Sequence, residues 1–337
     1  MDALAVGIIA NPSSGKDIRR LVARGSVFDN NEKINIVRRV LVGLAAVGVT
    51  NIYYMPDYFG IVPRALDGVH LELKAECLSM RENGDQRDST EAARLLEELG
   101  VGCLVTLGGD GTNRAVARGS CSLPIVAIST GTNNVFPELV EGTLAGLAAG
   151  LVATGAIERS EACRPTKLIE VLVDGVAVDI ALVDVAFSRD RFVGARAVWD
   201  PAAIRELVLA TAAPGTIGLS SIGAHLSPVE RDEPAGLHLR LGANVPTNSV
   251  LLGLRVLAPI APGLIAEVAV ASHRRLVIGE TVELALATGS LALDGEREII
   301  VSARQQVAVR LTFDGPPVID VSRALAAGAR AGRFIVG

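Results

Sequence analysis

A glycine-rich pentapeptide from Gly108 to Thr112, with the sequence Gly-Gly-Asp-Gly-Thr, directly follows a short apolar run. Glycines after a buried strand let the backbone turn sharply and leave room for phosphate oxygens against bare N–H groups. Thr112 is expected to cap the next helix, whose N-terminus attracts anions. A carboxylate among phosphates is unfavourable unless it holds a metal or accepts a proton, so Asp110 is predicted to do one of these. An ordinary Asp-Gly turn is the structural alternative.

Two better-known phosphate-binding motifs fail on spacing. A dinucleotide fingerprint needs Gly-x-Gly-x-x-Gly, but Arg114 stands where the third glycine belongs. A P-loop needs Gly-x4-Gly-Lys-Ser/Thr, and the candidate ending at Gly15 and Lys16 has Ala10 at its first glycine position and Asp17 after the lysine. The phosphate-binding hypothesis therefore depends on the pentapeptide and its surroundings.

Two further polar loops each follow an apolar run. The first is Asn11-Pro12-Ser13-Ser14-Gly15-Lys16, and the second is Gly131-Thr132-Asn133-Asn134. Ordinary turn chemistry explains the first equally simply, and a helix-entry loop explains the second, because Pro, Ser, Gly and Asn favour turns and caps. Beside the pentapeptide, both are predicted to line the same crevice, with Lys16 either neutralising phosphate or lying in solvent.

The elements expected to position these loops alternate between strand and helix. Apolar runs predict strands at 4–10, 51–55, 103–107 and 124–129, and helical spacing predicts helices at 32–47, 88–99 and 138–153, the second capped by Asp88. Such alternation is typical of an open parallel sheet, whose ligands bind beyond the carboxyl ends of the strands. All three loops follow strands, so we expect them to converge on one crevice.

The second half of the chain has the pattern of an all-β domain. Strands are predicted at 168–173, 177–187, 237–241, 250–258, 266–271, 282–287, 298–302 and 307–312, separated by turns such as Asp174-Gly175 and Asp294-Gly295. The predicted fold class is α/β, with an open parallel-sheet nucleotide-binding domain at 1–155 and a β-rich domain at 156–319. A C-terminal helix or tail at 320–337 is expected to return to the first domain.

Bulk composition excludes several classes of protein. The 337 residues carry a formal charge of −5, whereas a nucleic-acid binder normally has a basic face. The longest apolar stretches are too short or contain charges and prolines, so no membrane span is predicted. The four cysteines and four histidines lack metal-ligand spacing, and reduced thiols in a cytoplasmic protein are the simplest interpretation.

The three loops in this order resemble the NAD kinase and diacylglycerol kinase superfamily. The Asp294-Gly295-Glu296 segment is similar to the Asp-Gly-Glu of its lipid kinase branch. Gly43-Leu44 and Met55-Pro56-Asp57 most resemble the acetoin catabolism protein X group, which is ATP-NAD kinase-like. The resemblance implies a NAD kinase-like fold with the active site in the interdomain cleft.

The same resemblance implies roles for individual residues. Asp110 would be the general base or Mg²⁺ ligand, with Glu296 as a second candidate base. Asp184 and Thr216 would contact the substrate. The residues expected to bind ATP are Asn11, Ser13, Gly15, Lys16, Gly108, Gly109, Gly111, Thr112, Gly131, Thr132, Asn133 and Asn134.

Two departures from the NAD kinase pattern concern the acceptor. Val183 stands where an asparagine grips the dinucleotide in NAD kinases, leaving only Asp184 as the acidic partner. The loop from Pro214 to Leu219 lacks the tyrosine of the NAD kinase loop. The phosphotransfer motifs remain, so NAD is not expected to be an efficient acceptor.

The predicted function is a Mg²⁺- and ATP-dependent kinase acting on a small-molecule hydroxyl, NAD or another compound. Two alternatives stay open. One is a lipid kinase of the diacylglycerol type, and the other is a non-catalytic nucleotide-binding regulator linked to acetoin catabolism. A cytoplasmic homodimer without nucleic-acid partners is expected.

Overall fold

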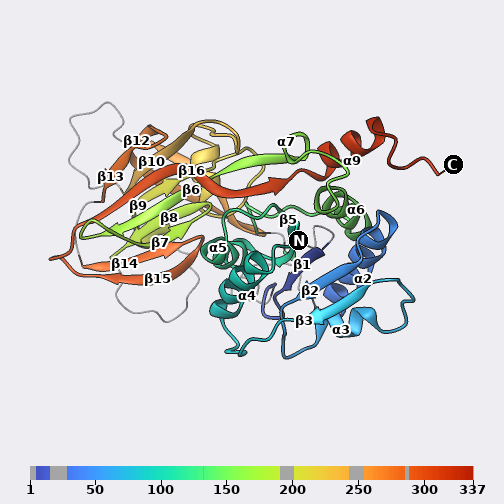
Figure 1. Cartoon of the computed structure of the whole chain (residues 1–337). Coiled ribbons are helices and arrows are strands. Elements are labelled where there is room, and N and C mark those ends of the chain that lie inside the picture. The colour runs from blue at the N-terminus through green and yellow to red at the C-terminus, as the bar shows by residue number, and fades with distance from the viewer. Residues whose placement is uncertain are drawn as a thin grey trace.

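Two β-sheets and a set of flanking helices make up the molecule (Figure 1). The computed structural model describes residues 5–15, 29–131, 133–189, 201–242, 254–284 and 288–336, and only the backbone at 297 and 298. Lys16 and Thr132 lie outside the described residues.

The first half of the chain forms a parallel sheet in the order β3-β2-β1-β4-β5. Its strands are β1 (Ala5–Ala10), β2 (Asn51–Tyr54), β3 (Lys74–Cys77), β4 (Cys103–Gly108) and β5 (Ile125–Ser129). Its helices are α2 (Asn30–Ala46), α3 (Ile61–Leu66), α4 (Gln86–Glu98), α5 (Asp110–Gly119) and α6 (Gly142–Ala153). The predicted open parallel sheet is confirmed, although α6 begins four residues after the expected start at 138.

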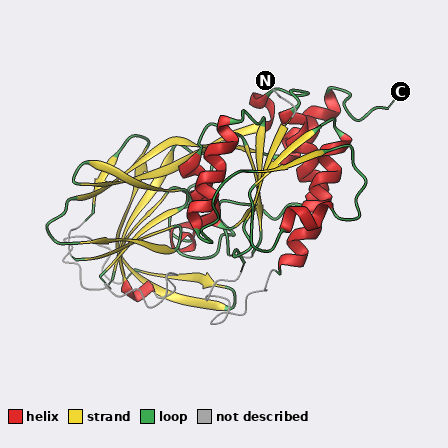
Figure 2. Cartoon of the chain, turned by 60° about the horizontal axis from the view of Figure 1, so that its bottom comes forward, coloured by secondary structure: helices red, strands yellow, loops and turns green. Residues whose placement is uncertain are grey.

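Both faces of this sheet are buried because helices cover each of them (Figure 2). Along β1, Val6, Ile8 and Ala10 pack with α2, α3 and α6, while Ala5 and Ile9 pack with α4 and α5. Burial on both faces explains the continuous apolar runs in the sequence, since a strand of this kind has no solvent-facing side.

The sheet does not end with the first half of the chain. The long strand β16 (Val307–Ile319) pairs in parallel with β5 at Val318 and antiparallel with β6 (Cys163–Val173). Strands β7 (Val176–Ala181) and β13 (Thr281–Glu283) complete this sheet of nine strands. One continuous sheet therefore joins the α/β and β-rich parts.

A second, antiparallel sheet of seven strands has the order β11-β12-β10-β9-β8-β14-β15. Its strands are β8 (Asp184–Ser188), β9 (Ile204–Leu209), β10 (Ala235–Leu241), β11 (Arg255–Ala261), β12 (Leu264–Val277), β14 (Gly289–Leu293) and β15 (Glu296–Val301). The remaining elements are α7 (Arg159–Ala162), η1 (Pro201–Ala203), α8 (Ser220–Ala224) and α9 (Val321–Arg330). The β-rich second half is confirmed.

The prediction of one strand at 177–187 is wrong. The chain leaves the first sheet after Ala181 and enters the second at Asp184, so β7 and β8 belong to different sheets. Leu182 and Val183 form the crossing between them.

Helix α9 lies over the first half of the chain and packs on α6 and α7 (Figure 1). Its Ala324 and Ala327 join the same buried cluster as α2 and α6. Asp320 caps it by accepting a hydrogen bond from the Arg323 amide. In the described part of the chain, no helix is both long and apolar enough to cross a membrane.

Two predicted helix caps are corrected. Helix α4 is capped by Asp85, whose carboxylate accepts from the Arg87 amide, while Asp88 lies in the first turn. Helix α5 begins after Gly109 rather than at Thr112, so Thr112 is its third residue and not its cap.

Candidate active site

The loop after β1 is closed by its own asparagine. Asn11 Oδ1 accepts from the Ser13 amide at 2.8 Å, and Asn11 Nδ2 donates to Thr112 Oγ1 at 2.9 Å. Gly15 ends the turn at a φ of 77°, which favours glycine. The structure therefore brings the loop that begins at Asn11 into direct contact with the pentapeptide.

Lys33 of α2 holds this loop from below. Its side chain is 0% exposed, and Nζ donates to the carbonyl oxygens of Asn11 and Ser14 at 2.8 and 2.7 Å. It also donates to Asn30 Oδ1 at 3.1 Å. Because these carbonyls accept hydrogen bonds from the ammonium group, the loop is held in place by the protein itself. Sequence reasoning missed Lys33, although it shares the buried helix face with Val37 and Val40.

The glycines of the pentapeptide make space for protein side chains. A Cβ on Gly108 would lie 2.4 Å from Thr112 Cβ, and a Cβ on Gly109 would lie 2.7 Å from Asn134 Oδ1. Neither Gly108, Gly109 nor Gly111 has a positive φ. The prediction that these glycines serve a sharp backbone turn is therefore wrong. Gly108 and Gly109 are needed because neighbouring side chains pack too closely for a Cβ atom.

Asp110 is held by two consecutive backbone amides. Its Oδ1 accepts from the Val135 and Phe136 amides at 3.0 and 2.8 Å, and Oδ2 lies 3.1 Å from the Val135 amide. We call residues 135–136 the strap. Arg231, from the second half of the chain, donates to the carbonyl oxygens of both strap residues. The strap thus connects Asp110 with Arg231.

The two asparagines before the strap behave differently. Asn134 Nδ2 donates to Ser129 Oγ at 2.7 Å, which fixes Asn134 on the end of β5. Asn133 Oδ1 is buried and has no hydrogen-bond partner among the described residues. It lies 3.6 Å from the Cβ position of Gly218 in the second half of the chain.

A pocket with an empty volume of about 360 Å³ lies between the two halves of the chain. The first half contributes Asp110, Asn133 and Val135 to its wall. The second half contributes Asp184, Ile217, Gly218, Leu219, Ser220, Ile260, Asp294 and Gly295. Ser220 is 1% exposed, and its Oγ has no hydrogen-bond partner in the described part of the chain.

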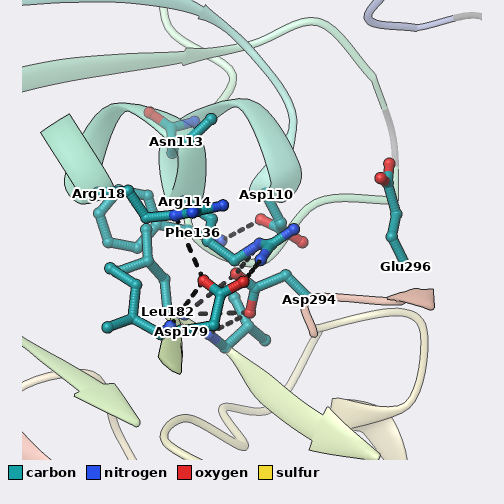
Figure 3. A network of polar contacts seen from close by, with 12 residues as sticks. Asp110, Asn113, Arg114, Arg118, Phe136, Asp179, Leu182, Asp294 and Glu296 are labelled. Atoms are coloured by element: carbon teal, nitrogen blue, oxygen red, sulfur yellow. Dashed lines mark hydrogen bonds and ion pairs between the residues drawn. The ribbon is translucent and has the colours of Figure 1, made fainter. Parts of the chain in front are cut away.

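Beneath Asp110, a buried arginine joins three elements (Figure 3). Arg114 of α5 is 0% exposed and pairs with Asp179 of β7 at 3.2 Å and with Asp294 at 3.9 Å. It also donates to Gln86 Oε1 at 3.2 Å. This network fixes α5 against the β-rich part.

Asp294 closes the crossing between β7 and β8. Its Oδ1 accepts from the Val183 and Asp184 amides at 2.8 and 3.2 Å, and both of its oxygens lie 3.1 Å from the Leu182 amide. Burial raises the pKa of Asp294 to about 6, against the lowering by Arg114 and by these amides. Its φ of 51° and that of Gly295, 79°, are those of a tight hairpin turn, as predicted.

Glu296, at the start of β15, is not among the residues that line the interdomain pocket. Its Oε2 accepts from Gln86 Nε2 at 2.7 Å, and its Oε1 is 3.4 Å from the Cβ position of Gly111. In Figure 3 its carboxylate lies apart from the Asp110 and Arg114 cluster. Glu296 therefore borders the pentapeptide without lining the interdomain pocket.

The two predicted substrate contacts lie at different places. Asp184 is 6% exposed and lines the interdomain pocket. Thr216 lies in the turn before the pocket wall, where its hydroxyl donates to the Ala213 carbonyl at 2.9 Å. Ile217 to Ser220, immediately after Thr216, supply part of the wall. The loop from Pro214 to Leu219 was singled out in the sequence, and it ends one residue before Ser220.

No cluster of three or more His, Cys, Asp or Glu side chains suited to a metal ion occurs among the described residues. Magnesium in phosphoryl-transfer sites is bound by one or two carboxylates together with substrate phosphates. Asp110, Asp184 and Asp294 are the carboxylates on the wall of the pocket. Asp294 is already engaged by three backbone amides and by Arg114, so such a metal would meet Asp110 and Asp184.

Comparison with known proteins assigns the two halves of the chain to two family models. Residues 6–157 match the ATP-NAD kinase N-terminal domain, and residues 167–314 match the acetoin catabolism protein X C-terminal domain. The chain is 39% identical over 333 residues to the acetoin catabolism protein X of Cupriavidus necator, covering 95% of this chain and 91% of that protein.

Two solved structures from Bacillus anthracis, both described as diacylglycerol kinases, are also similar. They show 14% and 15% sequence identity with TM-scores of 0.49 and 0.44, and each comparison covers 94% of this chain and 97% of the other. The fold is NAD kinase-like, as the sequence resemblance implied.

Proposed function

The chain belongs to the acetoin catabolism protein X family, and we propose that it is an ATP-dependent kinase that phosphorylates a small-molecule hydroxyl. The NAD kinase-like fold supports a kinase-type enzyme in general. Beyond this general assignment, we propose ATP as the nucleotide, Mg²⁺ as the metal and a small hydroxyl compound as the acceptor.

The composition of the interdomain pocket is the observation that carries the proposal. A carboxylate fixed by two amides, Asp110, shares this pocket with two buried oxygens, Asn133 Oδ1 and Ser220 Oγ. Both oxygens have no partner in the described part of the chain, and leaving a buried polar group unpaired costs about 1–3 kcal/mol. A polar ligand in the pocket would satisfy them.

ATP with Mg²⁺ is the ligand that we propose for this pocket and the adjoining N-terminus of α5. The first N–H groups of α5, from Asp110 to Thr112, have no intrahelical acceptor and favour an anion. The loop from Asn11 to Gly15 borders them through the contact between Asn11 and Thr112. Bound Mg²⁺ would neutralise the charge that develops on the transferred phosphoryl group.

The chemistry required of the protein is positioning and one proton transfer. Asp110 faces the pocket in a fixed orientation, so we assign it the acceptance of the proton from the attacking hydroxyl. The Arg114 network keeps α5 in register with the second half of the chain. Glu296, held by Gln86 beside Gly111, is the second candidate base.

Part of the pocket wall is apolar. Ile217, Leu219 and Ile260, all from the second half of the chain, supply this part. Such a wall suits a compact hydroxyl compound with an apolar part, and we propose an acceptor connected with acetoin catabolism. NAD is disfavoured, because Val183 is 1% exposed and lines a different pocket.

A non-catalytic nucleotide-binding regulator is the second candidate. It is favoured by the two amides that already occupy Asp110, which leave the carboxylate fewer lone pairs for a proton or metal. Such a protein would bind ATP in the same pocket without turning it over. Binding and turnover must therefore be measured separately.

The test is calorimetric titration of the protein with ATP and Mg²⁺, followed by an ADP-release assay with a panel of small hydroxyl compounds. Asn133→Ala should weaken ATP binding at least tenfold, while Asn35→Ala, on the exposed face of α2, should leave it unchanged. Absence of ATP binding at millimolar concentration would refute both candidates. Binding without ADP release for any compound would favour the regulator.

A further inference from the structure

A second pocket, with an empty volume of about 650 Å³, adjoins the interdomain pocket. Val135 of the strap lines both, but Asp110, Asn133 and Ser220 line only the first. Much of the wall of the second pocket is apolar. Its apolar side chains include Phe136, Pro165, Leu182, Val183, Val318 and Ile319.

Three cations line this pocket, and two of them have carboxylate partners. Arg164 pairs with Asp320, and Arg231 pairs with Glu138 at 2.9 Å while holding the strap. Lys167 differs from both, since it forms no ion pair with any residue that the structure describes.

Lys167 is 2% exposed, and its Nζ donates to the carbonyl oxygens of Glu230 and Ala235, each at 2.8 Å. An ammonium group has three donors, so one N–H remains for a ligand. Burial lowers the pKa of Lys167 to about 8, so the group still carries its charge at neutral pH. Asp232 and Glu230 favour the charged form and Arg275 opposes it, but none of the three forms an ion pair with Nζ, so the third N–H can serve an anionic ligand.

Thr211 adds a second polar group to the lining of this pocket. It is 7% exposed, lines the pocket, and its hydroxyl has no hydrogen-bond partner within the described ranges. A hydroxyl can donate to a carboxylate oxygen while Lys167 neutralises the charge. The pocket thus offers two hydrogen-bond donors, the Lys167 ammonium group and the Thr211 hydroxyl, together with apolar side chains.

The charge of the ligand is limited by three carboxylates. Glu138, Asp232 and Asp320 also line the pocket, and they disfavour a dianion such as a phosphate ester. We propose that this second pocket binds a small monocarboxylate, with its carboxylate on Lys167 and Thr211 and its hydrocarbon part along Leu182, Val183 and Val318. This site is separate from the proposed ATP site and does not depend on it.

The experiment titrates the full-length protein with hexanoate by calorimetry, with hexan-1-ol as the uncharged control of the same chain length. Hexanoate should bind and hexan-1-ol should not. ATP should leave the hexanoate affinity within a factor of about three, because the two ligands occupy different pockets. Hexanoate is tested up to 10 mM, about ten times a Kd of 1 mM. Failure of hexanoate to bind at this concentration, or equal binding of hexan-1-ol, would overturn the proposal.

Substitutions at three positions test the assigned residues. Thr211→Val removes the hydroxyl at constant shape and should weaken hexanoate binding about tenfold, whereas Thr211→Ser should retain it. Val318→Phe should abolish binding by filling the pocket. Lys167→Met should do the same, with Lys74→Met as the exposed control. Unchanged affinity in Thr211→Val and Val318→Phe would overturn the site even if Lys167→Met failed to fold.

Discussion

Asp110 and Glu296 are the two carboxylates next to the first turn of α5, and they contact different partners. Asp110 accepts from the strap amides and faces the interdomain pocket. Glu296 accepts from Gln86 and faces Gly111. Their different surroundings make their roles separable by single substitutions.

Asp110→Asn should lower the turnover of ATP by roughly 10²–10⁴-fold, because a general base contributes about that much to a rate. The variant keeps Oδ1 as the acceptor for the strap, so ATP affinity and unfolding temperature should change little. Steady-state ADP release gives the rate, and calorimetry gives the affinity. Glu296→Gln is the matched comparison. If Glu296→Gln shows the large loss and Asp110→Asn a small one, Glu296 is the base.

Asp294 should make stability depend on pH in a direction opposite to that of a salt-bridged carboxylate. Its folded-state pKa of about 6 lies above the ordinary 3.8, so the native state binds the proton more tightly. This contribution is complete below pH 4 and is lost as the pH rises through 6. Two pKa units correspond to roughly 3 kcal/mol.

The measurement compares urea unfolding of the wild type and of Asp294→Asn from pH 3.5 to pH 7. Asparagine tolerates the positive φ of this turn and retains an amide acceptor. The wild type should lose stability relative to the variant across this range. A constant difference between the two proteins would contradict the raised pKa of Asp294.

At the scale of elements, the loop after β1 depends on helix α2 through one side chain. Lys33→Met keeps the length of the side chain but removes the ammonium donor from the Asn11 and Ser14 carbonyls, of which the Asn11 carbonyl still accepts from the Ser14 hydroxyl. A buried acceptor left unpaired costs about 1–3 kcal/mol, so we expect a loss of roughly 1–3 kcal/mol in unfolding free energy. Urea denaturation measures it. Lys74→Met, at an exposed position, should cost less than about 0.5 kcal/mol.

The sequence predicts most elements of the first half because their pattern is local. Strands buried on both faces give continuous apolar runs, and helices such as 32–47 give regular spacing. The local pattern does not reveal the crossing between β7 and β8 at Leu182 and Val183, because both residues are apolar and continue the run. Amide hydrogen bonds to Asp294, more than 100 residues away, hold the crossing.

In the candidate site too, residues within local motifs were predicted and residues that depend on tertiary burial were missed. Asp110, Asn133 and Asp184 were predicted from motifs, and all three line the interdomain pocket. Ser220 and Lys167 were missed, because a single serine or lysine has no signal in the sequence until folding buries it. Lys33 had a signal in its spacing along the apolar face of α2, but a lysine there is ordinarily assumed to be exposed.

At the scale of the molecule, two connections besides the Arg114 network join the halves of the chain around the pocket. Strand β16 joins them through the backbone, because it pairs with β5 on one side and β6 on the other. Arg231 joins them through side-chain contacts with the strap and Glu138. The first connection fixes the sheet, and the second fixes the peptide groups that orient Asp110.

Arg231→Met should therefore reduce turnover without touching any ligand in the interdomain pocket. Without the guanidinium, the carbonyls of Val135 and Phe136 lose their donor, and the amides that hold Asp110 become free to shift. A misplaced catalytic group of this kind costs about 10²-fold in rate for a displacement of 1 Å. We expect kcat to fall at least tenfold while KM for ATP changes less than threefold.

Two further variants separate positioning from charge. Arg231→Lys keeps the charge but loses the planar fork that reaches both carbonyls, so it should restore only part of the rate. Arg255→Met removes an arginine from an exposed ion pair with Glu267 and should leave kcat unchanged. Full activity in Arg231→Met would show that the strap holds Asp110 unaided. A loss of ATP affinity equal to the loss of kcat would instead place Arg231 in nucleotide binding.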